Sequence, residues 1–534
     1  MAMKPTFAVV PPAPDADAET LKEFNKHLSR AELDFTRHRQ RISDCYKYAL
    51  PWRHMIDQII PTDQLDEIFD ETVQNVLEDF AADMGNTFTP RKNNWLKFQP
   101  RVTMELSDRA QIKDELAKYE NVMFSEMGRS NLYQALQEAY LDLGVGTMCL
   151  LITDIDPIKP IHCEAIALTD GRFTRGPFGY VDGIFRPKKM YLYEELLSVW
   201  PDADLSKLGP KPQDTSKEIE VADGCWRDWS DRGNETYRYV VRADGKLIYE
   251  KTWKGAGSCP FVPARWSRDS TTAIGVGPTY RTLPSIKTLN HVRYLDLKNY
   301  DKYVDPITSY EDDGVLNVDG GVVPGTWVPR APGSEAPETL ESKARFDVGV
   351  FERDELRSNI RRAHYQDRPE QLGKTPPSAT QWADEAAERA RRMGTPATNL
   401  VEELQYGIAR RFAYLLAARG TLPKVMLGGQ DIGIEPVSPL LRAQEQEKVV
   451  RNDKFAELII GRFGPQVGLI VIEIFEYANE QAAALGINSK LVRNKADLEE
   501  AIKKFLPVLQ ATGAIPSGGL PTAPPTGLVQ GGGP

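Results

Sequence analysis

The chain has 534 residues, with 66 Lys and Arg against 76 Asp and Glu, a net charge of -10 and 27% charged residues. It is several times longer than the ~100 to 200 residues of a typical domain, and its composition is that of a folded protein that stays in water. The negative charge disfavours a tight, sequence-independent DNA binder, because such proteins depend on many Lys and Arg contacts to phosphates. Any contact with DNA should therefore be weak and local.

No targeting or metal-binding pattern is apparent along the chain. The N-terminus, MAMKPTFAVVPPAPDADAET, has no basic stretch leading into an apolar run, and no later segment reaches the ~18 apolar residues of a membrane-spanning helix. The five cysteines are widely spaced and include no CxxC pair, which argues against a disulfide framework and a zinc knuckle. We expect a protein of a reducing cytoplasm that needs no cofactor.

The first third of the chain is predicted to be helical. Apolar residues at spacings of three and four indicate helices over residues 20–48, 63–86 and 108–127. A fourth helix is expected to start at Ser130, a plausible N-cap, and to end at Gly144 and Gly146.

The pattern then changes to mixed α and β. Residues 147–154, TMCLLITD, are typical of a buried strand, and Asp244-Gly245 between two alternating runs predicts a β-hairpin. A long helix is predicted from Pro278 to Tyr303. Its apolar residues recur at every third position and therefore wind around the helix, so several neighbours must cover it.

Two helices are predicted to bracket a small β insertion. Residues 304–346 are rich in Gly and Pro with short β-like pieces, and residues 347–367 are helical again. Another helix is expected to start at Ser378, to be interrupted at Gly394-Thr395-Pro396 and to continue to Arg419, and mostly helix follows from Ser438 to Leu506. The predicted fold class is mixed α+β, mainly helical.

The catalytic motifs in the sequence are incomplete. Gly373-Lys374-Thr375 ends like a phosphate-binding loop, but Arg368 stands where the loop needs its first glycine, and Pro376-Pro377 follows where a helix should begin. Gly275-Val276-Gly277 lacks the third glycine of a dinucleotide-binding turn, and the six histidines contain no HExxH. We therefore expect a protein that is not an enzyme.

Basic residues of the two predicted long helices have two readings. Arg353 and Arg357 could face DNA, but Glu352, Asp354 and Glu355 are interleaved at the spacing of helical ion pairs. The same holds for the basic residues of the earlier helix, among them Lys287 and Lys298. Periodicity does not choose between a DNA-facing strip and a salt-bridged surface.

Four segments, in order, resemble the portal (head-to-tail connector) proteins of T7-like podoviral bacteriophages. Residues 260–290, PFVPARWSRDSTTAIGVGPTYRTLPSIKTLN, are similar to a family passage in which a "PF…RW" strand leads through "YGxGP" into a helix reading "aLPdIktLN". Residues 68–98, 130–152 and 378–395 resemble the "D…G…LtPP…WF", "SNFY…lldl…GT" and "TATEV" blocks. Ala273-Ile274, Asn86 and Arg91-Lys92 depart from the family pattern.

The resemblance implies a portal fold assembled as a dodecameric ring with a central channel. Its regions would be a flexible arm (1–17), a wing (18–277), a first stem helix (278–303), a clip (304–346), a second stem helix (347–367), a channel or tunnel loop (368–377), a long kinked wing helix (378–430), a helical crown (431–508) and a disordered tail (509–534).

The implied function is a ring at the unique capsid vertex, through which DNA is packaged and ejected. The implied partners are other copies of the chain, double-stranded DNA held without sequence specificity, the terminase large subunit, a tail adaptor, and capsid and scaffolding proteins, with no membrane. The protein would be made in the host cytoplasm and reside in the virion. Candidate DNA-channel residues are Gln371, Lys374, Thr375, Arg353, Arg357, Lys287 and Lys298, and candidate clip contacts are Val323, Trp327 and Arg330.

Two other functions stay open at this point. A P-loop packaging ATPase is supported only by the tripeptide at 373–375. Another phage structural subunit, such as a tail adaptor or internal core protein, would share the composition but is less consistent with two long helices around an insertion.

Overall fold

The computed structural model describes residues 14–53, 67–91, 94–100, 106–155, 160–209, 216–231, 233–304, 308–311, 327–330, 346–366, 392–421, 432–436, 452–459, 461–462 and 477. The chain divides into two units, residues 1–439 and 440–534, and in the second unit residues 452–459 are helical. All elements named below belong to the first unit. The predicted fold class, a mixture of helix and sheet, is confirmed.

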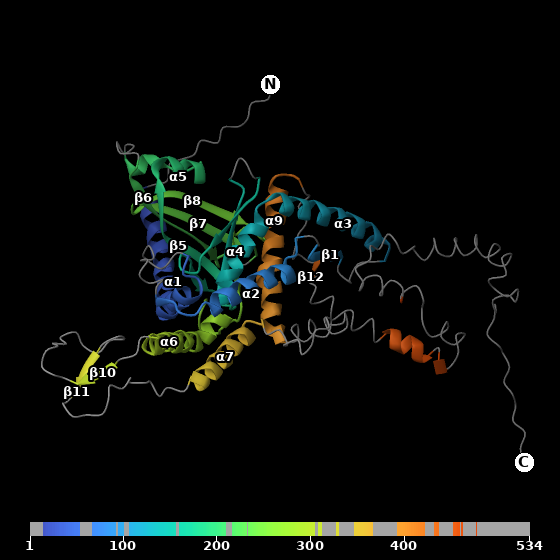
Figure 1. Ribbon diagram of the computed structural model, residues 1–534. Helices are drawn as coiled ribbons and strands as arrows, with labels where there is room; N and C mark the ends of the chain where they lie inside the picture. The colour runs from blue at the N-terminus through green and yellow to red at the C-terminus, as the bar shows by residue number, and fades with distance from the viewer. Residues whose placement is uncertain are drawn as a thin grey trace, which may run out of the picture. The chain divides into compact units, whose positions relative to one another are not determined.

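A five-stranded antiparallel sheet forms the largest β element (Figure 1). Its strands follow chain order and are β4 (Arg172–Arg175), β5 (Val181–Leu192), β6 (Glu218–Asp228), β7 (Thr236–Ala243) and β8 (Lys246–Lys254). The predicted hairpin joins β7 to β8. Asp244 and Gly245 both have positive φ, 46° and 78°, as a tight two-residue hairpin turn requires.

One face of this sheet is covered by α1 (Pro14–Ala49), which confirms and extends the predicted first helix. Phe24 of α1 packs against Phe185 of β5 and Trp226 of β6, with ring centroids 5.8 and 6.2 Å away. Ala31, Ala222, Val240 and Leu247 complete this buried cluster. The apolar stripe of α1 thus fixes the helix on the sheet.

The opposite face of the large sheet meets a three-stranded sheet ordered β3 (His162–Ile166), β2 (Thr147–Thr153) and β9 (Phe261–Arg265). Between the sheets, Arg186 of β5 forms a two-pronged ion pair with Asp223 of β6 at 2.8 and 2.9 Å and also reaches Glu164 of β3. Helix α4 (Leu132–Val145) packs on β2 and β3, and α2 (Thr72–Phe88) packs on α4. The predicted strand at 147–154 is confirmed.

Further elements of this unit pack against the sheets, the helices or one another. They are β1 (Leu96–Pro100), which pairs antiparallel with β12 (Ile432–Pro436), α3 (Leu106–Arg129), α5 (Tyr193–Val199), a short η2 helix (Leu205–Leu208), and η3 (Val401–Gln405) running into α9 (Tyr406–Ala418). Within the described residues, no helix combines the length and apolarity needed to cross a membrane.

Two predicted helix boundaries are wrong. The second helix begins at Thr72 rather than at Asp63, because Asp70 accepts a hydrogen bond from the Thr72 amide (3.0 Å) and residues 68–71 stay non-helical; residues 63–66 lie outside the described residues. Asn131, not Ser130, directly precedes α4, although the Ser130 hydroxyl accepts the Leu132 amide at 3.2 Å.

The predicted interruption at 394–396 is also wrong. Residues 392–400 are helical and continue through a π turn at Val401–Gln405 into α9. Pro396 removes one backbone hydrogen bond, but Met393, Ala397 and Leu400 form a buried stripe that holds the helix in place. The irregularity lies instead in the wider turn that follows.

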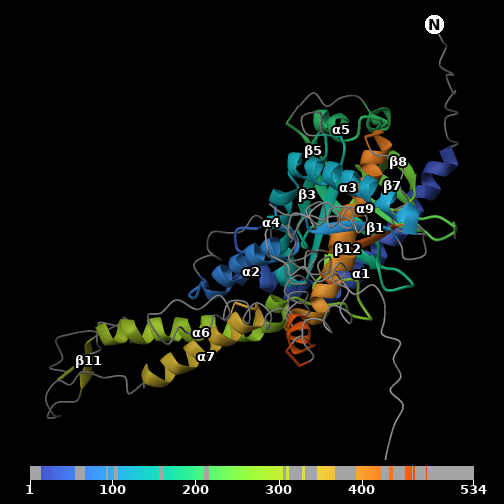
Figure 2. The same cartoon turned by 90° about the vertical axis from the view of Figure 1, so that its right-hand side faces the viewer.

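Two long helices extend side by side from the sheets (Figure 2). They are α6 (Pro278–Val304) and α7 (Phe346–Ala363), and α7 ends four residues before the end of the predicted helix at 347–367. Two short parallel strands, β10 (Thr308–Glu311) and β11 (Trp327–Arg330), belong to the segment between them. The predicted arrangement of helix, β insertion and helix is thus present.

Candidate functional site

The base of the α6–α7 pair is anchored in the body of the unit. Leu283, Ile286 and Leu289 of α6 and Ile360 of α7 are buried. His364, just after α7, is wholly buried. Its Nε2 atom lies 2.9 Å from the Thr279 hydroxyl of α6, and its Nδ1 atom lies 2.8 Å from the Ile360 carbonyl oxygen. Burial lowers the pKa of His364 to about 4, so the imidazole is neutral, donates to that carbonyl and accepts from Thr279.

Helix α6 contains a proline whose missing donor is replaced by an arginine. Pro284 has no N–H for the Tyr280 carbonyl four residues earlier. Arg41 of α1 donates to that carbonyl through Nη2 at 2.8 Å and Nε at 3.1 Å, and its guanidinium lies 4.5 Å from the centre of the Tyr280 ring. Helix α1 therefore fixes the first turns of α6.

Two Gly-Val-Gly segments, residues 144–146 and 275–277, pack backbone to backbone before α6. The Gly277 amide donates to the Val145 carbonyl at 3.0 Å, and the Gly275 amide donates to the Thr147 hydroxyl at 2.7 Å. A Cβ added to Gly275 would lie 2.4 Å from the Gly146 carbonyl oxygen. The predicted turn at 275–277 is therefore also a close contact that only glycine permits.

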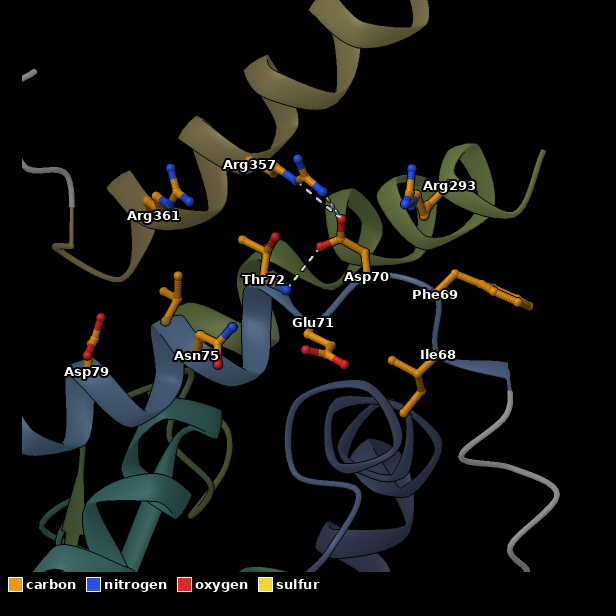
Figure 3. A pocket seen from close by; sticks show the side chains of 11 residues that line it. Ile68, Phe69, Asp70, Glu71, Thr72, Asn75, Asp79, Arg293, Arg357 and Arg361 are labelled. Atoms are coloured by element: carbon orange, nitrogen blue, oxygen red, sulfur yellow. Dashed lines mark hydrogen bonds and ion pairs between the residues drawn. The ribbon is translucent and has the colours of Figure 1, made fainter. Parts of the chain in front are cut away.

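A cleft of about 400 Å³ lies where the start of α2 meets α6 and α7 (Figure 3). Arg357 of α7 reaches Asp70 through Nη2 at 2.6 Å, with Arg293 of α6 and Arg361 of α7 on either side. Burial alone would raise the pKa of Asp70, but hydrogen bonds from Thr72 and Arg357 hold it below its ordinary value. The ion pair joins α7 to α2.

Arg293 and Arg361 differ from Arg357 in how their charges are compensated. No carboxylate of the described residues pairs with either side chain, whereas Asp70 neutralises Arg357. A guanidinium without an internal partner is free to meet an external anion. The cleft therefore holds two arginines without a direct ion-pair partner among the described residues, and the carboxylates of Glu71 and Asp79 also line it.

The outer half of α6 exposes apolar side chains on two opposite sides. Asp296 faces α7, where it pairs with Arg353 at 2.5 Å. Leu295 and Leu297 are one residue before and after Asp296, so they lie about 100° to either side of it, and they are 45% and 38% exposed. We call the Leu295 side the first flank.

The second flank continues along the helix. Tyr300 and Val304 follow Leu297 by three and seven residues, so they share its side, and they are 61% and 65% exposed. Exposed apolar stripes of this kind mark binding surfaces. A single chain leaves both flanks of α6 open.

The described residues contain no group of three His, Cys, Asp or Glu side chains that could hold a metal ion. The deeply buried ionisable groups lie in the body instead. Asp142 of α4 accepts a hydrogen bond from Tyr46 and pairs with Arg53 at 2.9 Å, and the Arg186–Asp223 pair lies between the sheets. These are structural ion pairs, although Arg53 also lines a second cleft of about 780 Å³ together with Trp52, Glu138 and Asp170.

Comparison with known proteins identifies the family. Residues 21–492 match the family described as bacteriophage head to tail connecting protein. The chain belongs to this family.

Solved structures similar to this connector come from gene transfer agent particles. A chain of the virion of the native gene transfer agent (GTA) particle is 11% identical, with a TM-score of 0.39, and the match covers 84% of this chain and 98% of that one. A chain from the neck of the empty GTA particle is 12% identical, with a TM-score of 0.38 and the same coverage. No curated protein matches the connector.

The four predicted DNA-channel residues that the structure describes all have partners inside the connector. Arg353 and Arg357 pair with Asp296 and Asp70, and Lys287 pairs with Asp44 of α1 at 2.6 Å. Lys298 lies 4.4 Å from the centre of the Tyr294 ring. The structure therefore shows ion pairs at Arg353, Arg357 and Lys287 and a cation–π contact at Lys298.

The other predicted site residues are only partly described. Trp327 and Arg330 lie on β11, in register with Thr308 and Glu311 of β10. Gln371, Lys374, Thr375 and Val323 lie outside the described residues.

Sequence reasoning left out Asp70 and Arg41, and it singled out neither Arg293 nor Arg361 among the basic residues of the two helices. An aspartate two residues before a helix is a detectable capping signal. A proline inside α6 could likewise have suggested that another residue supplies a donor. No pattern in the chain could show which arginine does so.

Proposed function

We propose that this connector is a portal protein, one subunit of a closed ring of typically twelve copies at the unique vertex of the capsid. The ring is the passage through which double-stranded DNA enters during packaging and leaves during ejection. It works as a structural part of the virion and carries no enzymatic activity. Family membership and the two long helices around a β insertion support this function.

The observation that carries the proposal is the pair of open apolar flanks on α6. A subunit that meets one neighbour through each of two different surfaces forms a head-to-tail ring when the rotation closes. Leu295 on the first flank and Leu297, Tyr300 and Val304 on the second provide two such surfaces. Burial of both flanks also accounts for apolar residues that wind around the helix.

Charge supports passage of DNA without a firm grip. Each subunit has a net charge of -10, so a ring is strongly negative and repels the phosphates of a duplex. Local contacts then come from cations without internal partners. We assign such contacts to Arg293 and Arg361 of the cleft. Independently of any pairing, we also assign contacts with DNA to Gln371, Lys374 and Thr375 of the proposed tunnel loop, and we give Arg353, Arg357, Lys287 and Lys298 a mainly structural role.

The remaining regions follow the same proposal. Residues 278–303 and 347–367 form the stem, residues 304–346 form the clip, and residues 431–508 form the crown. The clip docks the terminase large subunit during packaging and a tail adaptor afterwards, with Val323, Trp327 and Arg330 as candidate contacts. Capsid and scaffolding proteins are further partners of the ring, and residues 18–277 form its wing.

Electron microscopy of the purified full-length protein tests the ring directly. We expect class averages with a central hole and a single rotational symmetry, and a mass of about twelve chains by light scattering. Monomers alone, both under assembly conditions and in particles, would exclude the function. An ATPase assay of the wild type and Lys374→Ala separates the packaging-ATPase alternative, since a portal hydrolyses no ATP in either form.

A further inference from the structure

Two cysteines from different parts of the fold have their sulfur atoms in contact. Cys225 lies on β6, fully buried, and Cys259 lies in the segment that leads into β9 and is partly exposed. Their Sγ atoms are 3.9 Å apart. A disulfide requires an S–S distance of about 2.0 Å, so a small movement of the two side chains is enough to form one.

A buried cation lies beside this pair. Arg411 of α9 is 4% exposed and donates to the carbonyls of Gly257 and Ser258 at 3.3 and 2.9 Å, next to Cys259 in the chain. No carboxylate of the described residues forms an ion pair with Arg411, whose third acceptor is the Ile152 carbonyl. An uncompensated guanidinium next to a thiol favours the thiolate.

Cys259 is the more acidic of the two thiols, as expected for the cysteine that attacks an oxidant as a thiolate. The hydrogen bond between Cys259 and Cys225, together with a backbone hydrogen bond at Phe261 and the charge of Arg411, lowers the pKa of Cys259 although burial opposes this shift. Burial raises the pKa of Cys225 well above its ordinary value. Burial also raises the pKa of Cys45 and Cys163 to about 12, and that of Cys149 well above its ordinary value.

We propose that Cys259 and Cys225 form a peroxide-responsive disulfide pair, in which Cys259 attacks the oxidant and Cys225 closes the bond. The Cys259 thiolate sulfur attacks a peroxide oxygen, the O–O bond breaks, and a sulfenic acid and hydroxide form. The Cys225 sulfur then attacks the sulfenic sulfur, the S–O bond breaks and water leaves. Overall, two thiols are oxidised to one disulfide and hydrogen peroxide is reduced to two waters.

This disulfide would tie the centre of the five-stranded sheet to the segment that starts β9. The property belongs to the single chain, so it does not depend on the proposed ring. The bond would form when a protein assembled under reducing conditions meets an oxidising environment, and would restrain the two sheets against separation.

The test uses the full-length chain, first reduced, then freed of reductant and exposed near neutral pH to hydrogen peroxide. Peptide mapping by mass spectrometry should find a Cys225–Cys259 cross-link, a loss of two of the five thiols, and unmodified Cys45, Cys149 and Cys163. A protein that keeps all five thiols, or one in which Cys259 pairs with Cys149, would overturn the proposal.

Single substitutions separate the two roles. In Cys225→Ser, dimedone should trap a sulfenic acid at Cys259, whereas Cys259→Ser should form no disulfide and react with dimedone at least about tenfold more slowly. Cys45→Ser, which removes a buried thiol elsewhere, should cross-link as the wild type does. Preferential trapping at Cys225 would contradict the assignment, and early dimedone capture on the wild type decides the same question should a variant fold poorly.

Discussion

At the scale of single residues, the Tyr280 carbonyl shows how one chain position determines the need for another. Pro284 removes the helical donor, and Arg41 supplies two N–H groups in its place. The carbonyl is partly buried, and loss of its partners costs up to about 1 to 3 kcal/mol. The arginine is therefore required because the proline is present.

A double-mutant cycle measures this dependence. Arg41→Leu should lower the free energy of unfolding by about 1 to 3 kcal/mol, because the Tyr280 carbonyl loses its donors. In a Pro284→Ala background the helix regains its own N–H, so the same substitution should cost less, by about 1 kcal/mol. Urea unfolding of the four proteins provides the comparison. Equal costs in both backgrounds would show that Arg41 acts only through its packing on the Tyr280 ring.

Asp142 provides a pH-dependent prediction at the same scale. Its side chain is fully buried, and burial raises its pKa to about 7 although Arg53 and Tyr46 oppose the shift. The unfolded chain releases this proton near pH 4. Between these values the folded state binds more protons than the unfolded state, so raising the pH reduces stability, by at most about 1.4 kcal/mol per unit.

Asp142→Asn isolates this contribution because asparagine does not titrate. The stability of the wild type relative to Asp142→Asn should fall from about pH 4 to about pH 7 and level off above it. Urea midpoints of both proteins across this range measure the difference. A difference that grows with pH would mean that the ion pair with Arg53 outweighs burial.

At the scale of elements, the two Gly-Val-Gly segments hold the start of α6 against the junction of α4 and β2. Gly275→Ala places a methyl group 2.4 Å from the Gly146 carbonyl oxygen, and we expect a loss of about 1 to 3 kcal/mol. Gly394→Ala is the matched control, since nothing lies within 4 Å of the added Cβ and its helix should gain about 0.5 to 1 kcal/mol. The thermal unfolding temperatures of the two variants and the wild type test both expectations. Similar behaviour of the two would mean that the contact at Gly275 relaxes easily.

The same elements show what a sequence can and cannot predict. Periodicity and turn chemistry are local, so the β7–β8 hairpin and the extent of α6 and α7 were predictable from neighbouring residues. The contact between residues 144–146 and 275–277 joins segments far apart in the chain, and no local pattern encodes it. Pro396 misled the prediction because tertiary packing of its buried neighbours outweighs the local preference of proline.

Site residues follow the same division. The basic character of α6 and α7 was visible in the sequence. The closest acidic partners of Arg353, Arg357 and Lys287, however, all lie on other segments of the chain, which a local pattern does not reveal. Composition therefore located the charged helices without showing which cations are free. The structure shows that Arg293 and Arg361 form no ion pair with a carboxylate of the described residues, so they replace the paired residues as candidates.

At the scale of the whole molecule, the two flanks of α6 predict a specific pattern of assembly. In a head-to-tail ring the first flank of one subunit meets the second flank of the next, so loss of either flank should stop growth. Leu295→Asp alters the first flank, and Leu297→Asp with Tyr300→Asp alters the second. Leu197→Asp, at another exposed leucine on α5, is the matched control and should still form rings.

Mixing the flank variants distinguishes a ring from a symmetric dimer. Each variant alone should remain monomeric, because its intact flank finds only a damaged partner surface. When the two variants are mixed, the intact second flank of one should bind the intact first flank of the other and form a heterodimer. The heterodimer should not grow further, because both of its unpaired flanks carry aspartates. In a two-fold dimer each patch would pair with itself, so a variant with one intact flank would form homodimers alone. Mass photometry of the separate and mixed variants reads out these states, and homodimers of either variant would contradict head-to-tail assembly through α6.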